Sequence, residues 1–375
     1  MIYQRYEPVD PRDAFSVAAS PDSEGTQDAA ASQAAFLLST RAAVLGVDED
    51  QQMWREESKN EGFELPELAP LQRTKRMKVD EATQRLGVST KELASEKSPA
   101  LQGEMTKLVH DMYDSPSLGA AAALFEGSMR SDHPLVAVAG AAGARETTRM
   151  RSGIGTILEE GSNSDDPLVA GVARAALGQI RPTSPYVRER VGPRTEIKRR
   201  DHESHTAVIT HGTWASGNDW YKPDGDFHNG LSQHRNDVHD ASFTWSGGYS
   251  HGARRLGAID LDNWLNAQQL DSPDFYAHSH GGTVVNLATH RGLTFENLVL
   301  MSWPVHQQWF PDFDKVADRI IDIRVRMDLV ILADRGGQRF RPAHPKVIER
   351  RNGWFNHFVT HESEYWDDNG LWGIV

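Results

Sequence analysis

Hydrophobic and polar positions follow two different patterns along this chain, and the change comes near residue 204. Beyond it, short apolar, β-rich runs alternate with stretches of helical spacing. We predict strands at six of these runs: 207–210, 238–245, 275–277, 298–301, 320–325 and, more weakly, 347–348. Strands separated by helices are typical of βαβ units, which form parallel sheets with right-handed crossovers. The pattern therefore predicts an α/β domain with a mainly parallel sheet over residues 204–375.

The first half of the chain has helical periodicity. Residues 28–45 are alanine-rich and end at a glycine, which predicts a helix. The segment SDHPLVA at 131–137 returns as SDDPLVA at 164–170, 33 positions later. A repeat of that period is typical of stacked helix pairs, and Asp-x-Pro-Leu is a good helix start. The region 101–180 thus resembles HEAT-type repeats, with an ordinary alanine-rich bundle as the alternative.

The expected helix pairs have defined bounds. First helices are predicted at 117–129 and 147–160, each followed by a helix that opens at the Asp-x-Pro-Leu motif, and 101–112 could begin a third, weaker unit.

Composition divides the rest of the chain. Residues 1–100 are interpreted as a flexible N-terminus with isolated helices, and 1–27 contain few large apolar residues that could anchor a core. Residues 181–203 combine three prolines with many charged residues, which is typical of a linker; a phosphate-binding strip is the alternative. A length of 375 residues is consistent with two domains.

Charge and hydropathy exclude several classes of protein. The net charge of −13 argues against general nucleic-acid binding, which needs a positive surface. No apolar run is long enough to predict a transmembrane segment, and the first residues lack the pattern of a secretory signal, so we expect a cytoplasmic protein. The absence of cysteine excludes disulfides, thiolate metal sites and a cysteine nucleophile.

The segment Ala277-His278-Ser279-His280-Gly281 has the pattern of a nucleophile elbow. It lies between a predicted strand and a predicted helix, and the residues two before and two after the serine are small. Such a turn exposes the serine hydroxyl above the carboxyl edge of the sheet. The alternative is a glycine-rich turn with an incidental serine. We interpret Ser279 as a candidate nucleophile.

A His-Gly pair at the end of the first strand supports this interpretation. Acyl-transfer enzymes need preorganised N–H donors where the oxyanion develops. The residue after such a pair, Thr213, and the residue after the nucleophile, His280, are placed to supply these amides.

An acid and then a base should follow the serine along the chain. Asp328 ends the strand that includes 320–325, at the carboxyl edge of the sheet, and is the favoured acid, with Asp334 and Asp322 as competitors. The histidines beyond it are His344, His357 and His361. Of these we favour His361, on a polar loop nearest the C-terminus, over His357.

Together these motifs resemble those of bacterial α/β-hydrolases of the lipase and esterase kind, over residues 205–375. The resemblance implies a Ser-Asp-His triad of Ser279, Asp328 and His361 and an oxyanion hole at Thr213 and His280. The usual first two strands have no counterpart, so a reduced core is expected, without a long cap insertion. A small-molecule or lipid ester is the implied substrate.

Three further expectations concern ligands. Tryptophans just after predicted strands, at Trp214, Trp245 and Trp303, suggest an aromatic substrate pocket, although core packing explains any one of them as well. The spacing His357-x-x-x-His361 could place two zinc ligands on a helix face, but no Glu follows His357, and we predict no metal. No phosphate loop or dinucleotide motif is present, and no cofactor is predicted.

The sequence therefore predicts a serine hydrolase that cleaves carboxylic esters, preceded by helical repeats. An alternative from another class is a partner-binding repeat protein whose hydrolase module is regulated or inactive.

Overall fold

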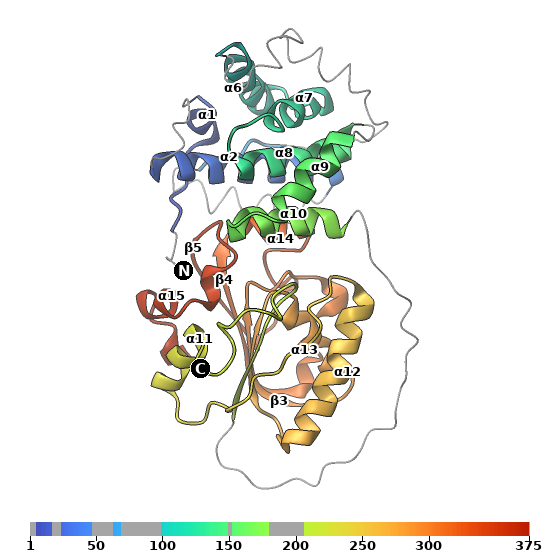
Figure 1. Ribbon diagram of the computed structural model, residues 1–375, viewed down its shortest axis with the longest axis vertical. Coiled ribbons are helices and arrows are strands. Elements are labelled where there is room, and N and C mark those ends of the chain that lie inside the picture. The colour runs from blue at the N-terminus through green and yellow to red at the C-terminus, as the bar shows by residue number, and fades with distance from the viewer. Residues whose placement is uncertain are drawn as a thin grey trace.

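The structure is a computed structural model that describes residues 5–16, 24–46, 63–68, 99–148, 152–179 and 206–374. It has a layer of helices at one end and an α/β unit at the other (Figure 1). The chain is thus a mixed α/β protein. The predicted linker at 181–203 lies outside the described residues.

A five-stranded sheet forms the centre of the α/β unit. All its strands are parallel and are hydrogen-bonded in chain order. They are β1 (Ala207–Thr210), β2 (Asp274–His278), β3 (Phe295–Met301), β4 (Val316–Arg326) and β5 (Val347–Trp354). The predicted parallel sheet is confirmed. An architecture of this kind is compatible with an α/β-hydrolase-like fold.

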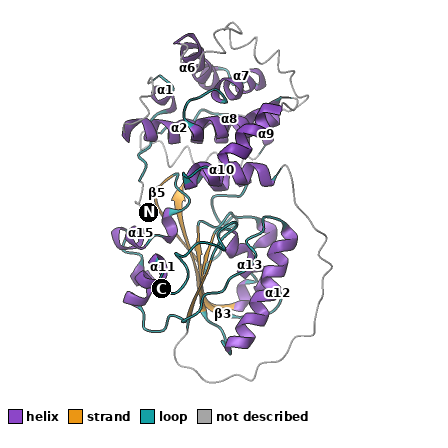
Figure 2. Cartoon of the chain, viewed as in Figure 1, coloured by secondary structure: helices purple, strands orange, loops and turns teal. Residues whose placement is uncertain are grey.

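Helices cover both faces of the sheet (Figures 1 and 2). On one face lie α12 (His251–Gln268) and α13 (His280–His290), and on the other α11 (Asp226–His234) and α15 (Ser363–Asp368). Successive residues of a strand point to opposite faces. Phe275 and Ala277 accordingly belong to the core beneath α12 and α13, and Tyr276 belongs to the other. Burial on both faces explains why the strands read as continuous apolar runs.

The α/β unit also contains short 3₁₀ helices, at Gln307–Trp309, Phe313–Lys315, Val359–His361 and Trp372–Ile374.

The free edge of β1 is paired by a loop instead of a further strand. The backbone amide of Ala207 donates to Asp237 at 2.9 Å, and that of Phe243 donates to Ile209 at 3.1 Å. Only two isolated bridges result, so the predicted strand at 238–245 is wrong. The loop nevertheless satisfies edge amides and carbonyls that would otherwise be open to another chain.

Seven helices are described in the N-terminal half: α1 (Pro11–Ala14), α2 (Glu24–Leu45), α6 (Pro99–Asp114), α7 (Leu118–Ser128), α8 (Pro134–Thr147), α9 (Ser152–Gly161) and α10 (Pro167–Gly178). Both Asp-x-Pro-Leu motifs start a helix with proline in the first turn, and the Asp166 carboxylate caps α10 by accepting from two amides. The prediction that a helix begins at Thr147 is wrong, because Thr147 is the last residue of α8. Whether these helices are HEAT-type repeats stays a prediction.

The N-terminal segment contributes to the helical core. Tyr6 and Phe15 are 6% and 5% exposed and pack in the same cluster as Phe36 of α2. The expectation that residues 1–27 could anchor no core is therefore wrong for its described part, because two aromatic rings suffice to fix a short segment against α2.

The two halves share one apolar core. Leu329 and Leu332 of α14 (Leu329–Asp334) and Phe355 after β5 are buried in the same cluster as the N-terminal helices. The carbonyl of Ala333 accepts hydrogen bonds from Arg41 at 3.0 Å and from Gln179 at 2.8 Å. The helical half is therefore packed directly on the α/β unit.

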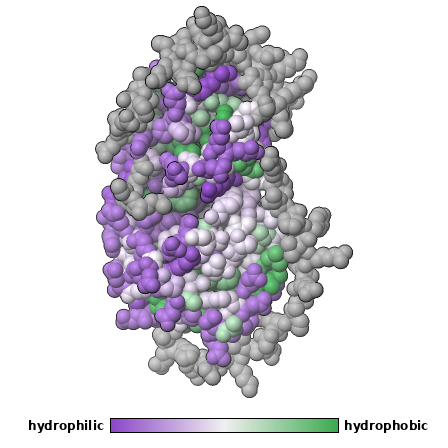
Figure 3. All heavy atoms as spheres, viewed as in Figure 1, coloured by the Kyte–Doolittle hydropathy of each residue, from purple (hydrophilic) through white to green (hydrophobic). Residues whose placement is uncertain are grey.

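Polar residues cover the left side of the surface in Figure 3, and pale and green residues gather toward its middle. Among the helices that the structure describes, none is long and apolar enough to cross a membrane.

Candidate active site

Ser279 lies in a strained turn between β2 and α13. Its backbone has φ 52° and ψ −133°, a conformation that L-residues rarely adopt and that structures keep mainly at functional sites. Gly281 is required here, since a Cβ on it would lie 2.5 Å from the His211 carbonyl oxygen. A Cβ on Gly212 would likewise lie 2.7 Å from that of Ser279. The predicted strand–elbow–helix context of Ser279 is present.

Asp328 lies directly after β4 and is fully buried. Its Oδ1 caps α14 by accepting from the amides of Val330 and Ile331, both at 3.0 Å. Its Oδ2 lies 2.7 Å from Nδ1 of His357, which is 2% exposed. The two capping bonds leave the carboxylate little freedom to rotate, so it holds the imidazole in one orientation.

The expected pairing of Asp328 with His361 is wrong in this structure. The nearest acidic partner of His361 Nδ1 is Glu362 at 3.7 Å, too far for a hydrogen bond, and the ring stacks on Trp220 with centroids 4.2 Å apart. Burial lowers the pKa of His361 to about 3.

Strand register explains which histidine meets Asp328. Backbone pairing between β4 and β5 continues past the sheet, with the Phe355 amide donating to Arg326 and the Leu329 amide donating to Phe355. The residues that follow two parallel neighbouring strands lie at the same edge of the sheet. His357 follows β5 and Asp328 follows β4, so the two side chains lie beside each other. In the sequence, the short spacing of His357 from the end of its strand could have indicated this pairing. The apolar pattern of β5 was too weak to show where that strand ends.

The other acid candidates have different partners. Asp322 lies inside β4 and forms a fully buried ion pair with Arg324 at 2.6 Å. Asp334 accepts a hydrogen bond from the Tyr249 hydroxyl and lies 3.2 Å from Nε2 of His280. Neither is paired with His357.

The two candidate oxyanion donors lie on either side of the elbow. The amide of His280 is the first of α13, where a helix amide has no acceptor within the helix. Thr213 follows Gly212, which contacts Ser279. The His280 side chain contacts Arg254 at 3.0 Å and Asp334, and burial, with the charge of Arg254, lowers its pKa to about 3. Its neutral imidazole therefore adds no charge to the turn.

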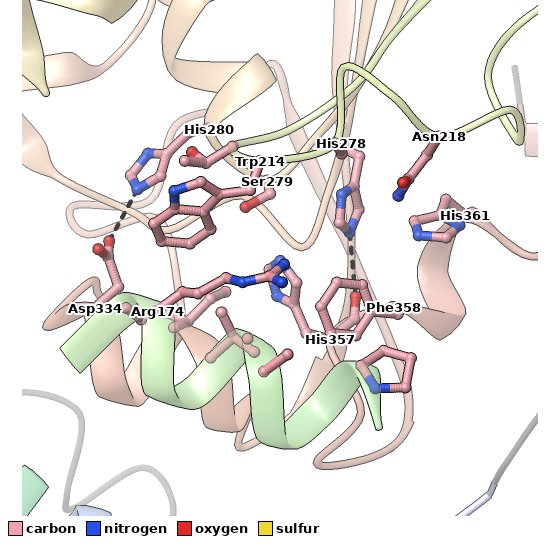
Figure 4. Close-up of a pocket in the computed structure, with 18 of the residues that line it drawn as sticks. Arg174, Trp214, Asn218, His278, Ser279, His280, Asp334, His357, Phe358 and His361 are labelled. Atoms are coloured by element: carbon pink, nitrogen blue, oxygen red, sulfur yellow. Dashed lines mark hydrogen bonds and ion pairs between the residues drawn. The ribbon is translucent and has the colours of Figure 1, made fainter. Parts of the chain in front are cut away.

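A cavity of about 260 Å³ opens over Ser279, and residues from both halves of the chain line it (Figure 4). From the α/β unit come Thr213, Trp214, Asn218, Trp220, Tyr249, His278, Ser279, His280, Pro304, Val330, Asp334, His357, Phe358, His361 and Glu362, among others. From the helical half come Pro167, Ala170, Gly171, Arg174 and Ala175 of α10, with Ser164 and Asp165 before it. Thus α10 forms one wall of the cavity.

Of the three tryptophans predicted to line the pocket, only Trp214 does so. The indole Nε1 of Trp245 donates to the His211 carbonyl at 2.9 Å, and this contact fixes the His-Gly turn. Trp303 is fully buried and donates to Thr283 at 3.0 Å. Both are packing residues, whereas Trp220, which sequence reasoning did not single out, lines the cavity.

The described residues contain no group of three or more His, Asp or Glu side chains that could hold a metal ion. His361 is the last residue of the 3₁₀ turn Val359–His361 and His357 lies before that turn, so the two do not share an α-helix face, and Asp328 occupies Nδ1 of His357.

Comparisons with known proteins give little further information. No protein-family model and no curated protein matches this sequence. The crystal structure of Aspergillus fumigatus lipase B is similar with 10% sequence identity and a TM-score of 0.26, over 75% of this chain and 77% of the lipase. A TM-score this low does not establish a common fold, so the assignment of the site depends on its own geometry.

Proposed function

We propose that this protein is a serine hydrolase that cleaves carboxylic esters, with Ser279, His357 and Asp328 as its triad. The observation that carries the proposal is the 2.7 Å contact between the fixed carboxylate of Asp328 and His357 Nδ1, in the same cavity as a serine on a strained elbow. His357 takes the role that the sequence analysis gave to His361.

In the proposed mechanism, His357 accepts the proton of the Ser279 hydroxyl through Nε2 as the oxygen attacks the ester carbonyl. Asp328 keeps the proton on Nδ1 and stabilises the imidazolium cation. The amides of Thr213 and His280 donate to the oxyanion. His357 then returns the proton to the leaving alcohol, and a water molecule activated by the same imidazole hydrolyses the acyl-enzyme.

The cavity favours a small ester over a long lipid. Its volume of about 260 Å³ lies just below the range of roughly 300–1,000 Å³ that is typical of drug-sized ligands. The side chains of Trp214 and Phe358 form an apolar part of the cavity wall, and α10 closes one side of the cavity. We propose that the helical half, HEAT-like or not, limits the size of substrate that reaches Ser279.

Labelling with a fluorophosphonate probe tests the function, because only an activated serine reacts with it. The wild-type protein should be labelled, and Ser279→Ala should not. Ser272→Ala is a matched control, since Ser272 also has a positive φ of 50° but lies before β2, outside the cavity. If Ser279→Ala is labelled as strongly as the wild type, the proposed nucleophile is wrong.

A further inference from the structure

Arg174 extends from α10 into the cavity, toward His357 and Ser279 (Figure 4). Its Nε donates to the Ser162 carbonyl at 2.9 Å, in the turn before α10. This bond holds the base of the guanidinium and leaves its two terminal nitrogens for another partner. Among the described residues, no carboxylate forms an ion pair with Arg174.

The carboxylates that line the cavity are those of Asp165, Asp334 and Glu362, and among the described residues none of them forms an ion pair with Arg174. The Asp334 carboxylate is bound by Tyr249 and His280 and interacts with the charge of Arg254. Burial keeps the pKa of His278 well below its ordinary value, and His280 and His361 are also neutral at pH 7. Arg174 is the one Arg or Lys among the described residues that line the cavity.

The terminal nitrogens of a half-buried guanidinium can donate charge-assisted hydrogen bonds to an anion that enters the cavity. The planar fork of arginine matches the two oxygens of a carboxylate, which it binds with two parallel hydrogen bonds. Neighbouring Ala170 and Ala175 of α10 are small and line the same cavity.

We propose that Arg174 binds a carboxylate on the substrate, so that the preferred substrates are small esters that carry a second, anionic group near the scissile carbonyl. This proposal rests on the proposed hydrolase function. It assigns a specificity-determining residue to the helical half and gives that half a role in substrate selection.

Two pairs of model esters test it in the full-length protein. In the first pair the charge is on the acyl side: mono-4-nitrophenyl glutarate and its neutral methyl ester. In the second it is on the alcohol side: 4-acetoxybenzoate and its methyl ester. For each pair we would measure kcat/KM, subtract spontaneous hydrolysis, and count active sites by fluorophosphonate titration.

The wild type should prefer the anionic ester in at least one pair. In Arg174→Gln the ratio of anionic to neutral kcat/KM should fall about 10- to 100-fold, as expected for the loss of a charge-assisted hydrogen bond. Arg174→Lys should keep part of the preference because it keeps the charge. Arg350→Gln, which removes an exposed arginine outside the cavity, should leave the ratio unchanged.

Two results would overturn the proposal while the hydrolase function stands. One is an active wild type without a preference in either pair. The other is an equal loss in Arg174→Gln on both esters of the pair in which the wild type prefers the anion, which would place the guanidinium at the oxyanion. Absence of both labelling and hydrolysis would overturn the proposed function and this inference together.

Discussion

Asp328 makes two connections with one carboxylate: Oδ2 lies 2.7 Å from His357 Nδ1, and Oδ1 caps α14. The same side chain therefore orients the proposed base and fixes the helix on which the N-terminal half packs. The two roles can be separated, because asparagine caps a helix about as well as aspartate does.

Asp328→Asn should lose activity and keep its stability. The amide oxygen can accept the two capping bonds, but the amide nitrogen is a donor and cannot accept the hydrogen bond from the His357 Nδ1–H. We expect kcat to fall about 10⁴-fold, as for other serine triads, while the thermal unfolding midpoint changes little. Asp328→Ala should also lose about 1 kcal/mol of stability with the cap. Near-normal kcat in Asp328→Asn would show that the pair is structural only.

The two histidines can be distinguished by their kinetics. His357→Ala should reduce kcat/KM to the same floor as Ser279→Ala, and the double variant should be no worse, since triad members act as a unit. His361→Ala removes a ring stacked on Trp220 and should keep most of the activity. The opposite ranking on a 4-nitrophenyl ester would restore His361 as the base.

Packing between the halves depends on Gly171. A Cβ there would lie 2.8 Å from Val330 Cγ2 and 3.0 Å from Phe358 Cζ, so Gly171→Ala should overpack the contact and destabilise the protein by about 1–3 kcal/mol. Gly155→Ala in α9 is the matched control. Its Cβ would meet nothing within 4 Å, and the helix should gain up to about 1 kcal/mol. Chemical denaturation would measure both, and equal effects would argue against a close contact.

Glu362 predicts a pH dependence of stability. Burial, together with the charge of Asp226, raises its pKa from 4.5 to about 7. Below pH 4.5 the side chain is protonated in both states and has no effect. As the pH rises toward 7 the unfolded chain loses its proton first, so the free energy of unfolding falls, by at most about 3 kcal/mol.

Glu362→Gln should remove this fall between pH 4.5 and 7, as measured by urea denaturation at pH 5 and pH 8. The exposed Glu160→Gln should behave like the wild type. A variant with the wild-type slope would show that Glu362 ionises normally.

The sequence by itself determined the features that depend on neighbouring residues. The apolar runs predicted the five strands of the sheet, the last one weakly, and small residues around Ser279 predicted the elbow, because its strained turn is set by local sterics. Proline after an acidic residue predicted the starts of α8 and α10 for the same reason.

Tertiary structure alone decided what depends on register and packing between distant segments. His357 and His361 are both close to β5 in sequence, and only the pairing of β5 with β4 places His357 at Asp328. Trp303 follows a strand as Trp214 does and Trp245 ends an apolar run, yet the indole N–H groups of Trp245 and Trp303 have hydrogen-bond partners in the core. Arg174 lies about a hundred residues before Ser279 and reaches the cavity because Gly171 lets α10 approach α14 closely. Contacts of this kind arise from the joint packing of many side chains, which no local pattern encodes.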